Sequence, residues 1–232
     1  MITLTVIIPV YNEQATILKV VRKVKNVPID KEIIIVDDAS TDRTSEILKA
    51  FGDDPVVTVL THPENMGRGA GIRTALAHAQ GYITVFQDGD LELDPSHFPR
   101  LIEPILDGET DIVFGSRFLG KGFILGMGFH AYLANVFLAQ LTDIIFKASL
   151  TDVLTMFQVA KTSVFRELKI SADRWNSTIE ITAKILKKGW PIVELPVDYV
   201  PRTAKKGKKV KPKYFFSCLW TLIKYRYFHR EK

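Results

Sequence analysis

The chain has 232 residues, of which 47% are hydrophobic, so it is long and apolar enough for one large domain with its own core. Its one cysteine, Cys218, excludes an internal disulfide and is compatible with a reducing compartment, which favours the cytoplasm. The formal net charge of +5 conceals an asymmetry, because residues 202–232 hold 11 Lys or Arg and one Glu, whereas residues 1–201 hold 20 basic and 25 acidic residues. The basic segment indicates an anionic partner, namely membrane lipid, nucleic acid or a phosphate-bearing ligand, unless it is only a solvated tail.

Neither a secretion signal nor a membrane-spanning helix is predicted. The first expected strand starts close to Met1, with no basic region, apolar segment and cleavage site before it. The most apolar stretch, 123–146, is interrupted by polar residues, so no window reaches the roughly 18 uninterrupted apolar residues of a spanning helix. The interrupting residues are His130, Asn135, Gln140 and Asp143.

The first half of the chain alternates short β-branched runs with helical stretches, which predicts βαβ units and a parallel sheet. Strands are expected at 4–9, 32–37, 56–60, 82–87 and 111–115. Apolar residues at helical spacing predict helices around 17–24, 47–51 and 72–79, and Gly52 and Gly81 stand where helix stops are expected. Because crossovers are right-handed, we expect an open, doubly wound sheet with its ligand site at the carboxyl ends of the strands.

The second half has a different character. Helices are expected at about 131–147 and 175–188, with a strand at about 192–199. Residues 214–228 interleave aromatic and aliphatic side chains with Lys224 and Arg226, which predicts an amphipathic helix at a membrane surface.

The central chemical signal is Gln87-Asp88-Gly89-Asp90, which ends a predicted strand and is followed closely by Glu92. Two carboxylates spaced by one residue can converge on a hard cation such as Mg²⁺ or Mn²⁺, and the glycine permits a turn and close approach of a ligand. Such an ion would leave positions open for a diphosphate. An Asp-Gly-Asp sequence alone is also common in turns.

Further polar clusters follow the other predicted strands. Asp37 and Asp38 close the second strand, where a carboxylate can accept from a nucleobase N–H or ribose hydroxyl, while Asp42 or Thr41 can cap the next helix. Pro9-Val10-Tyr11-Asn12-Glu13 ends the first strand and offers an aromatic face beside a carboxylate. The glycine-rich segment 65–71 opens the third helix, where free N–H groups could approach an anion, although it lacks the P-loop pattern.

In this order and spacing, IIPVYNE, VDDASTD, NMGRGAGIRTAL, QDGDLE and GSRF resemble family 2 glycosyltransferases of the GT-A fold. The resemblance covers the whole chain, and IEITAKILKKGWPIVELPVDYVPRTAKKGKK is similar to the branch that glycosylates dolichyl or polyprenyl phosphate. It implies an α/β fold with a Rossmann-like, mostly parallel sheet, a nucleotide-sugar-binding half at 1–117, an acceptor half at 118–201, and a basic loop and tail helix at 202–232.

The resemblance also implies site residues. Those expected to hold the nucleoside and diphosphate are Pro9, Tyr11, Glu13, Val36, Asp38, Asp88 and Gly89. Those expected to bind the metal are Asp88, Asp90 and Glu92, and those expected to meet phosphate charge or act in transfer are Asp90, Arg117, Glu180, Arg202 and Lys208. For each of Arg117, Arg202 and Lys208 a structural ion pair is an equal alternative, and for Glu180 the equal alternative is a salt bridge on the helix surface. The Lys-rich segment 205–213 resembles a mobile loop that closes over the site.

The implied activity is an inverting, metal-dependent transfer of a hexose from a GDP-mannose or UDP-glucose type of donor to a polyprenyl or dolichyl phosphate, from a peripheral position on the cytoplasmic face of a membrane. One departure affects the acceptor: related sequences read Thr-Asp-x-Glu-Thr where this one has Leu154 in place of the acid. A phosphate acceptor is already largely ionised at pH 7 and needs no strong base, whereas a sugar hydroxyl acceptor would need a carboxylate such as Asp152 or Glu180.

Two other enzyme classes are disfavoured. A sugar-phosphate nucleotidyltransferase should carry a glycine-rich basic loop after the first strand, and a nicotinamide dehydrogenase should carry Gly-x-Gly-x-x-Gly there; the chain has Pro-Val-Tyr-Asn-Glu. A transfer enzyme acting on a glycan hydroxyl, an inactive transferase fold that only binds lipid or a partner, and nucleic-acid binding by the tail stay open.

Overall fold

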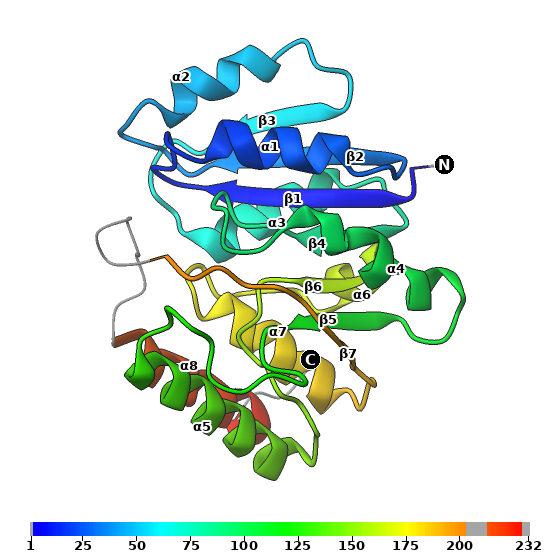
Figure 1. Cartoon of the computed structure of the whole chain (residues 1–232), viewed down its shortest axis with the longest axis vertical. Coiled ribbons are helices and arrows are strands. Elements are labelled where there is room, and N and C mark those ends of the chain that lie inside the picture. The colour runs from blue at the N-terminus through cyan, green and yellow to red at the C-terminus, as the bar shows by residue number, and fades with distance from the viewer. Residues whose placement is uncertain (1, 203–212, 229–232) are drawn as a thin grey trace.

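The computed structural model describes residues 2–202 and 213–228. These residues form a seven-stranded sheet with the order β3-β2-β1-β4-β6-β5-β7. Figure 1 shows this sheet with helices on both faces, as expected for the α/β class. The strands are β1 (Leu4–Val10), β2 (Lys31–Asp37), β3 (Val57–Thr61), β4 (Ile83–Phe86), β5 (Ile112–Ser116), β6 (Gln158–Lys161) and β7 (Val193–Pro196).

The helices are α1 (Ile17–Asn26), α2 (Thr44–Leu48), α3 (Arg68–His78), α4 (Phe98–Leu106), α5 (Phe129–Phe146), α6 (Thr162–Glu167), α7 (Ser177–Lys187) and α8 (Lys213–Ile223). Short 3₁₀ turns follow α2 at Lys49–Phe51 and precede α4 at Pro95–His97, and a π-helical turn, Lys224–Phe228, continues α8. The sequence analysis placed the helices α1, α3, α5, α7 and α8 within a few residues of these bounds.

The sheet is mostly parallel, and its exception is β6. Strand β1 pairs in parallel with β2 and β4, and β5 pairs in parallel with β7. Strand β6 runs antiparallel between β4 and β5, so a strand of the second half of the chain completes the sheet of the first half. The sequence analysis did not predict β6, because a strand of four residues with the sequence QVAK carries too little β-branched signal.

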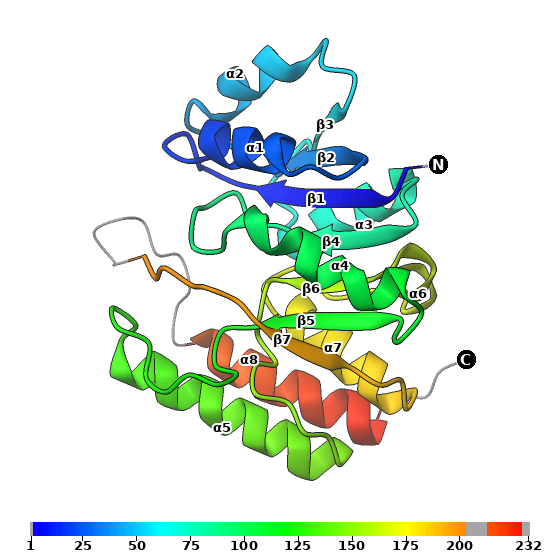
Figure 2. The ribbon, with the colours of Figure 1, turned by 45° about the vertical axis from the view of Figure 1, so that its right-hand side comes forward.

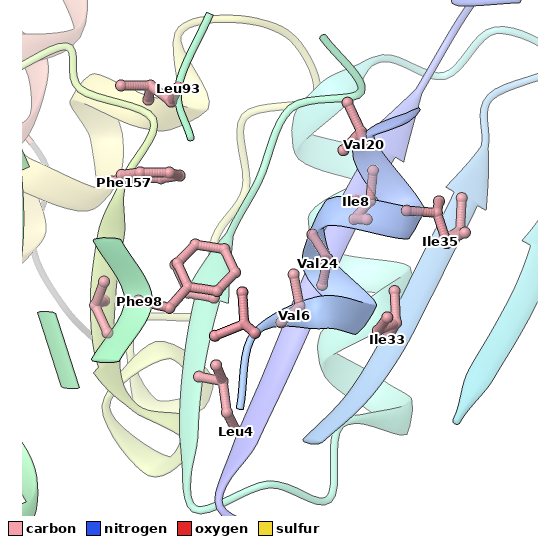
Figure 3. Packing of buried hydrophobic residues seen from close by; sticks show 14 of the residues in the cluster. Leu4, Val6, Ile8, Val20, Val24, Ile33, Ile35, Leu93, Phe98 and Phe157 are labelled. Atoms are coloured by element: carbon pink, nitrogen blue, oxygen red, sulfur yellow. The ribbon is translucent and has the colours of Figure 1, made fainter. Parts of the chain in front are cut away.

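Each face of the sheet has its own apolar layer. Helices α1 and α4 cover one face; Figure 3 shows Val20 and Val24 of α1 close to Ile8 and Val6 of β1. On the same face, Phe98 of α4 meets the ring of Phe157 edge-on, with 5.4 Å between centroids. Helices α3, α6 and α7 cover the other face. The inner strands β1, β4 and β5 are therefore buried on both sides, which explains their nearly continuous apolar runs, whereas the edge strands β3 and β7 are partly exposed.

Gly81 was expected to stop a helix, but α3 ends three residues earlier, at His78. A Cβ at Gly81 would lie 2.5 Å from the backbone nitrogen of Thr5, and the Gly81 N–H donates to Thr5 Oγ1 at 2.9 Å. The glycine is required by the close approach of the chain to β1 rather than by the helix end.

Helices α5, α7 and α8 form a third apolar cluster at one end of the molecule, and α5 and α8 lie side by side in both Figure 1 and Figure 2. Cys218, Leu222 and Tyr225 of the tail helix are buried against Ile179 and Ala183 of α7. The predicted helix at 214–228 is therefore present, and one of its faces belongs to the folded core.

Within the described residues one helix, α5, is long and apolar enough to cross a membrane by length and composition, and 17% of it is buried inside the molecule. The sequence analysis predicted no such helix because polar residues interrupt the stretch. Two of them turn inward: Asn135 accepts a hydrogen bond from Arg117, and Asp143 accepts one from the backbone of Leu150. The other two, His130 and Gln140, are exposed, so the outer surface of α5 is mostly but not wholly apolar.

Candidate active site

Two adjoining hollows lie at the carboxyl ends of the central strands. The first, here called the polar pocket, has a volume of about 390 Å³ and is lined by Pro9, Val10, Tyr11, Glu13, Asp38, Asn65, Gly67, Arg68, Asp88, Gly89, Asp90, Arg174, Trp175, Arg202 and Tyr214. The second, the apolar cavity, has a volume of about 790 Å³ and lies between the sheet edge and helices α5 and α8. Asp88, Asp90 and Arg202 line both, so the two hollows meet at the Asp-Gly-Asp motif.

The acidic residues at this junction surround the side chain of Arg202. Its Nη2 donates to Asp90 Oδ2 at 2.6 Å and its Nη1 to Glu13 Oε2 at 3.0 Å. Its backbone N–H donates to Glu92 Oε1 at 2.7 Å. Glu13 lies far in sequence from Asp90 and Glu92, and a single cation at position 202 contacts all three carboxylates.

The charge at the junction remains unbalanced despite Arg202. Burial, together with the neighbouring carboxylates of Asp88 and Glu92, raises the pKa of Asp90 to about 7. Asp88 itself accepts a hydrogen bond from Arg68 Nε at 3.0 Å. Like charges held this close in a partly buried site favour a further cation.

The donor set fits a divalent metal. In the part of the chain that the structure describes, no group of three or more His, Cys, Asp or Glu side chains converges as a preformed metal cluster. Asp88 and Asp90 nevertheless present carboxylate oxygens to the same pocket, and such oxygens are the ligands preferred by Mg²⁺ and Mn²⁺. Both carboxylates are held by arginines, so the fit requires Arg202 to turn away from Asp90.

Asp38 is buried at the back of the polar pocket, where it orders the loop before α3. Its Oδ1 accepts from the N–H of Met66 at 2.8 Å and contacts His62 Nδ1 at 2.7 Å, and its Oδ2 accepts from the N–H of Gly67 at 2.8 Å. A carboxylate has about four acceptor positions, so one remains for a ligand N–H or hydroxyl. Asp38 thus has a structural role, and one acceptor position is left for the recognition role that the sequence predicts.

The glycine-rich loop does not offer the free N–H groups that the sequence analysis expected. The N–H groups of Gly69 and Ala70 both donate to the carbonyl of Asp173, at 2.7 and 3.2 Å. A Cβ at Gly69 would lie 2.0 Å from the carbonyl oxygen of Ala172, so the glycine serves close packing of α3 against the segment before α7. The N–H groups of Gly69 and Ala70 at the start of α3 are therefore satisfied by the protein itself.

Arg117 was expected to meet phosphate charge, and the structure shows the alternative, a buried ion pair. Its Nε and Nη2 donate to the two carboxylate oxygens of Asp152 at 2.6 and 2.8 Å, and its Nη2 also donates to Asn135 Oδ1. Asp152 is held in turn by Glu194, which accepts from its backbone N–H. Arg117 still lines the apolar cavity, with its fork directed at Asp152.

The expectation that Glu180 faces the acceptor is wrong. The residue is fully buried and lines neither hollow. Its carboxylate pairs with Lys184 at 2.7 Å and accepts from Tyr225 Oη at 2.6 Å. Burial alone would raise the pKa of Glu180, but these partners hold it below its usual value. Glu180 thus connects α7 to the π-helical turn after α8 through its hydrogen bond from Tyr225.

The remaining predicted site residues differ in where the structure places them. Pro9, Tyr11, Glu13, Asp88, Gly89, Asp90 and Arg202 line the polar pocket, and Glu92 lines the apolar cavity. Val36 is in the core with its side chain fully buried, so it contributes no side-chain contact to a ligand. Lys208 lies outside the described residues.

Four further residues line the polar pocket that no sequence motif predicted to be there: Arg68, Arg174, Trp175 and Tyr214. Arg68 stands within the recognised glycine-rich motif, where attention to its charge would have found it. The other three come from segments far from the motifs and carry no local pattern.

The comparisons with known proteins agree with this arrangement. A model of glycosyl transferase family 2 matches residues 5–168, more than half of the chain, so the chain belongs to glycosyl transferase family 2. It is similar to the low-salt glycan biosynthesis hexosyltransferase Agl6 of Haloferax volcanii, with 26% identity over 204 residues that cover 86% of this chain and 48% of that protein. It is also similar to the dolichol-phosphate mannosyltransferase of Pyrococcus furiosus, with 28% identity over 225 residues that cover 93% of this chain and 61% of that protein. The chain thus spans about half the length of these curated relatives, and the family expected from the motifs is confirmed.

Solved structures show the same fold. Glucosyl-3-phosphoglycerate synthase from Mycobacterium tuberculosis, in complex with Mn²⁺, uridine diphosphate and glucosyl-3-phosphoglycerate, superposes with a TM-score of 0.71 at 22% identity, covering 97% of this chain and 80% of that one. S. aureus TarS in complex with UDP-GlcNAc gives a TM-score of 0.65 at 19% identity, covering 97% of this chain and 66% of that one. The predicted fold of the GT-A type is therefore confirmed.

Proposed function

We propose that this family 2 glycosyltransferase moves a hexose from a nucleotide sugar to a polyprenyl or dolichyl phosphate at a membrane surface. The observation that carries the proposal is the junction of two hollows of opposite character at one acidic motif. The polar pocket suits a nucleoside diphosphate, and the apolar cavity suits the hydrocarbon part of a lipid. A donor in the polar pocket and an acceptor in the apolar cavity would therefore meet beside Asp88 and Asp90.

The donor side rests on the residues of the polar pocket. Tyr11 offers a ring to a nucleobase, Asp38 has one acceptor position left, and Asp88 and Asp90 would hold the divalent metal beside the diphosphate. When bound, the metal would neutralise negative charge that grows on the diphosphate as the glycosidic bond breaks. The fold relative from Mycobacterium tuberculosis was crystallised with Mn²⁺ and uridine diphosphate, which supports this assignment.

The acceptor side rests on what the apolar cavity contains and on what its carboxylates already bind. Leu154, Met156, Phe137 and Phe215 give it a hydrocarbon lining. Asp152 and Glu180, the examples named above of a base for a sugar hydroxyl, are committed to Arg117 and Lys184. An ionised phosphate acceptor needs no such base. The similarity to a dolichol-phosphate mannosyltransferase points the same way.

In the proposed step, an acceptor phosphate oxygen attacks the anomeric carbon from the face opposite the departing diphosphate, so the configuration inverts. The carbon–oxygen bond to the donor breaks, and its electron pair leaves on the diphosphate. Arg202, once released from Asp90, is placed to meet the phosphate of donor or acceptor at the junction. The role of Lys208 remains a prediction of the sequence.

Membrane attachment belongs to the same proposal. Helix α8 and its π-helical end expose Phe216, Trp220, Tyr227 and Phe228, and α5 exposes Phe129, Leu133, Phe137 and Ile144. These two helices lie side by side around the apolar cavity (Figure 2). Aromatic and aliphatic side chains beside Lys224 and Arg226 suit an anionic lipid surface, and we place the enzyme on the cytoplasmic face.

The test is a transfer assay with radiolabelled GDP-mannose and UDP-glucose, Mn²⁺, and either a polyprenyl phosphate or a free glycoside as acceptor. The proposal expects a lipid-extractable, mild-acid-labile product from one of the two donors. Label appearing only on the glycoside would instead support a transferase acting on a sugar hydroxyl. Binding of the donor without transfer to any acceptor would support the inactive binding module.

A further inference from the structure

Arg68 is a buried cation at the floor of the polar pocket that none of the predicted roles uses. It is the first residue of α3, and its side chain is 7% exposed. Its Nε donates to Asp88 Oδ1 at 3.0 Å and its Nη1 to Thr178 Oγ1 at 3.2 Å, and the guanidinium lies 5.8 Å from the ring centroid of Trp175. Contacts from two other segments, the Asp-Gly-Asp motif and the start of α7, fix its orientation.

The third nitrogen of this guanidinium has no partner. Within the described residues, Arg68 Nη2 is buried and finds no hydrogen-bond acceptor. Leaving a charged donor buried and unsatisfied costs free energy, and native proteins seldom tolerate it without a reason. A ligand oxygen that arrives in the pocket would remove that cost.

The position of Arg68 indicates which ligand atoms would do so. It lines the polar pocket together with Asp88, Gly89 and Asp90, where the metal and diphosphate are expected. The backbone N–H groups of Gly69 and Ala70, next to it in α3, are already bound by Asp173. The side chain of Arg68 is therefore the cationic group that the start of α3 retains for an anion.

We propose that Arg68 binds the diphosphate of the sugar donor directly through Nη2, while Asp88 and Trp175 hold its guanidinium in place. The inference rests on the proposed function and adds a protein ligand for the leaving group. As the bond from the anomeric carbon to the diphosphate oxygen breaks, the electron pair stays on that oxygen, and a fixed guanidinium stabilises it without having to reorient. Arg68 and the metal share this charge.

The experiment measures binding rather than turnover, by isothermal titration calorimetry with the whole chain. The probes are GDP, UDP, inorganic pyrophosphate and the two nucleosides, each in EDTA and in Mn²⁺. The variants are Arg68→Gln, Arg68→Lys, and the control Arg73→Gln. Arg73 lies on the same helix, pairs with Asp173 at the surface and lines neither hollow, so the control removes an equal charge from α3.

Arg68→Gln should weaken the binding of diphosphates and pyrophosphate about tenfold or more, in EDTA as well as in Mn²⁺, and leave nucleoside binding unchanged. Arg68→Lys should lie between, because it keeps the charge and loses the fork. Arg73→Gln should match the wild type. Thermal melting shows whether each variant is folded. If Arg68→Gln does not fold, the comparison of Arg68→Lys with the wild type provides the test.

Two outcomes would overturn the inference. A loss seen in Mn²⁺ and absent in EDTA would mean that Arg68 acts only by orienting Asp88. An equal loss for nucleosides and diphosphates would mean that it only shapes the pocket. If the wild type binds no diphosphate, the proposed function fails with it, whereas tight binding by wild type and Arg68→Gln alike refutes the role of Arg68 alone.

Discussion

At the scale of single residues, the site is held together by arginines that each satisfy carboxylates from distant segments. Arg202 joins Glu13, Asp90 and Glu92, and Arg117 joins Asp152 to the end of β5. The two ion pairs differ in environment. Arg202 borders both hollows, and its partner Asp90 is also a proposed metal ligand. The side chain of Asp152, in contrast, is fully buried.

Asp90→Asn should therefore separate activity from stability. We expect transfer to fall on the order of 100-fold, because one charged metal ligand is lost, while the melting temperature changes little, because Arg202 keeps Glu13 and Glu92. Initial rates at saturating Mn²⁺ and thermal melting measure the two quantities. Asp107→Asn, at the exposed end of α4, is the matched control. Near wild-type rates for Asp90→Asn would refute the metal assignment.

Asp152→Asn should show the opposite behaviour towards stability. Removing one charge of a buried ion pair leaves Arg117 uncompensated, so we expect the free energy of unfolding to fall by about 3 kcal/mol. Urea denaturation followed by fluorescence gives this value. Asp111→Asn removes a surface pair with Lys161 and should cost at most about 0.5 kcal/mol. Equal effects of the two substitutions would contradict a structural role for the Arg117–Asp152 pair.

At the scale of elements, α8 and the π-helical turn after it have one face that packs on the core and one face that is exposed. Cys218, Leu222 and Tyr225 pack on α7, and Tyr225 Oη donates to Glu180. Phe216, Trp220 and Phe228 are exposed, and the rings of Trp220 and Phe228 stack at 6.1 Å. Deleting the whole segment would open the core, so its surface role has to be tested by substitution.

Replacing Phe216, Trp220 and Phe228 together by Ser should weaken binding to anionic vesicles about tenfold or more, because buried apolar area drives insertion at an interface. Co-sedimentation at low and high salt measures this. Binding of GDP or UDP should be unchanged, since none of these three side chains lines the polar pocket. Leu106→Ser, an exposed apolar residue on α4, is the control. Unaltered sedimentation of the triple variant would shift attention to α5.

At the scale of the whole molecule, one continuous sheet joins the two halves that the sequence analysis separated near residue 117. Strand β6 pairs with both β4 and β5, and β7 extends the sheet beyond β5. The segment before α7 also closes over the start of α3. Residues from both halves of the chain therefore belong to one sheet and its helices, and a ligand at the junction of the two hollows should stabilise all of it.

A nucleoside diphosphate present at about 100 times its dissociation constant with Mn²⁺ should add about 2.7 kcal/mol to stability, a rise of roughly 5 to 10 °C in melting temperature. The shift should appear as one transition and shrink in EDTA. Thermal melting with GDP, UDP, ADP and CDP ranks the base. A shift of equal size in EDTA would contradict a metal at Asp88 and Asp90.

The sequence by itself determined the parallel strands β1 to β5, the two acidic motifs at their ends and the family, because each depends on local pattern. It could not determine β6, whose four residues become a strand only between two existing neighbours. It also left open whether Arg117 and Glu180 act on a ligand or within the protein, since that depends on Asp152, Lys184 and Tyr225. Only the tertiary structure brought Arg202 onto the acidic motif and left one nitrogen of Arg68 without a partner. Such roles depend on burial and on contacts between residues far apart in the sequence, and a local sequence pattern specifies neither.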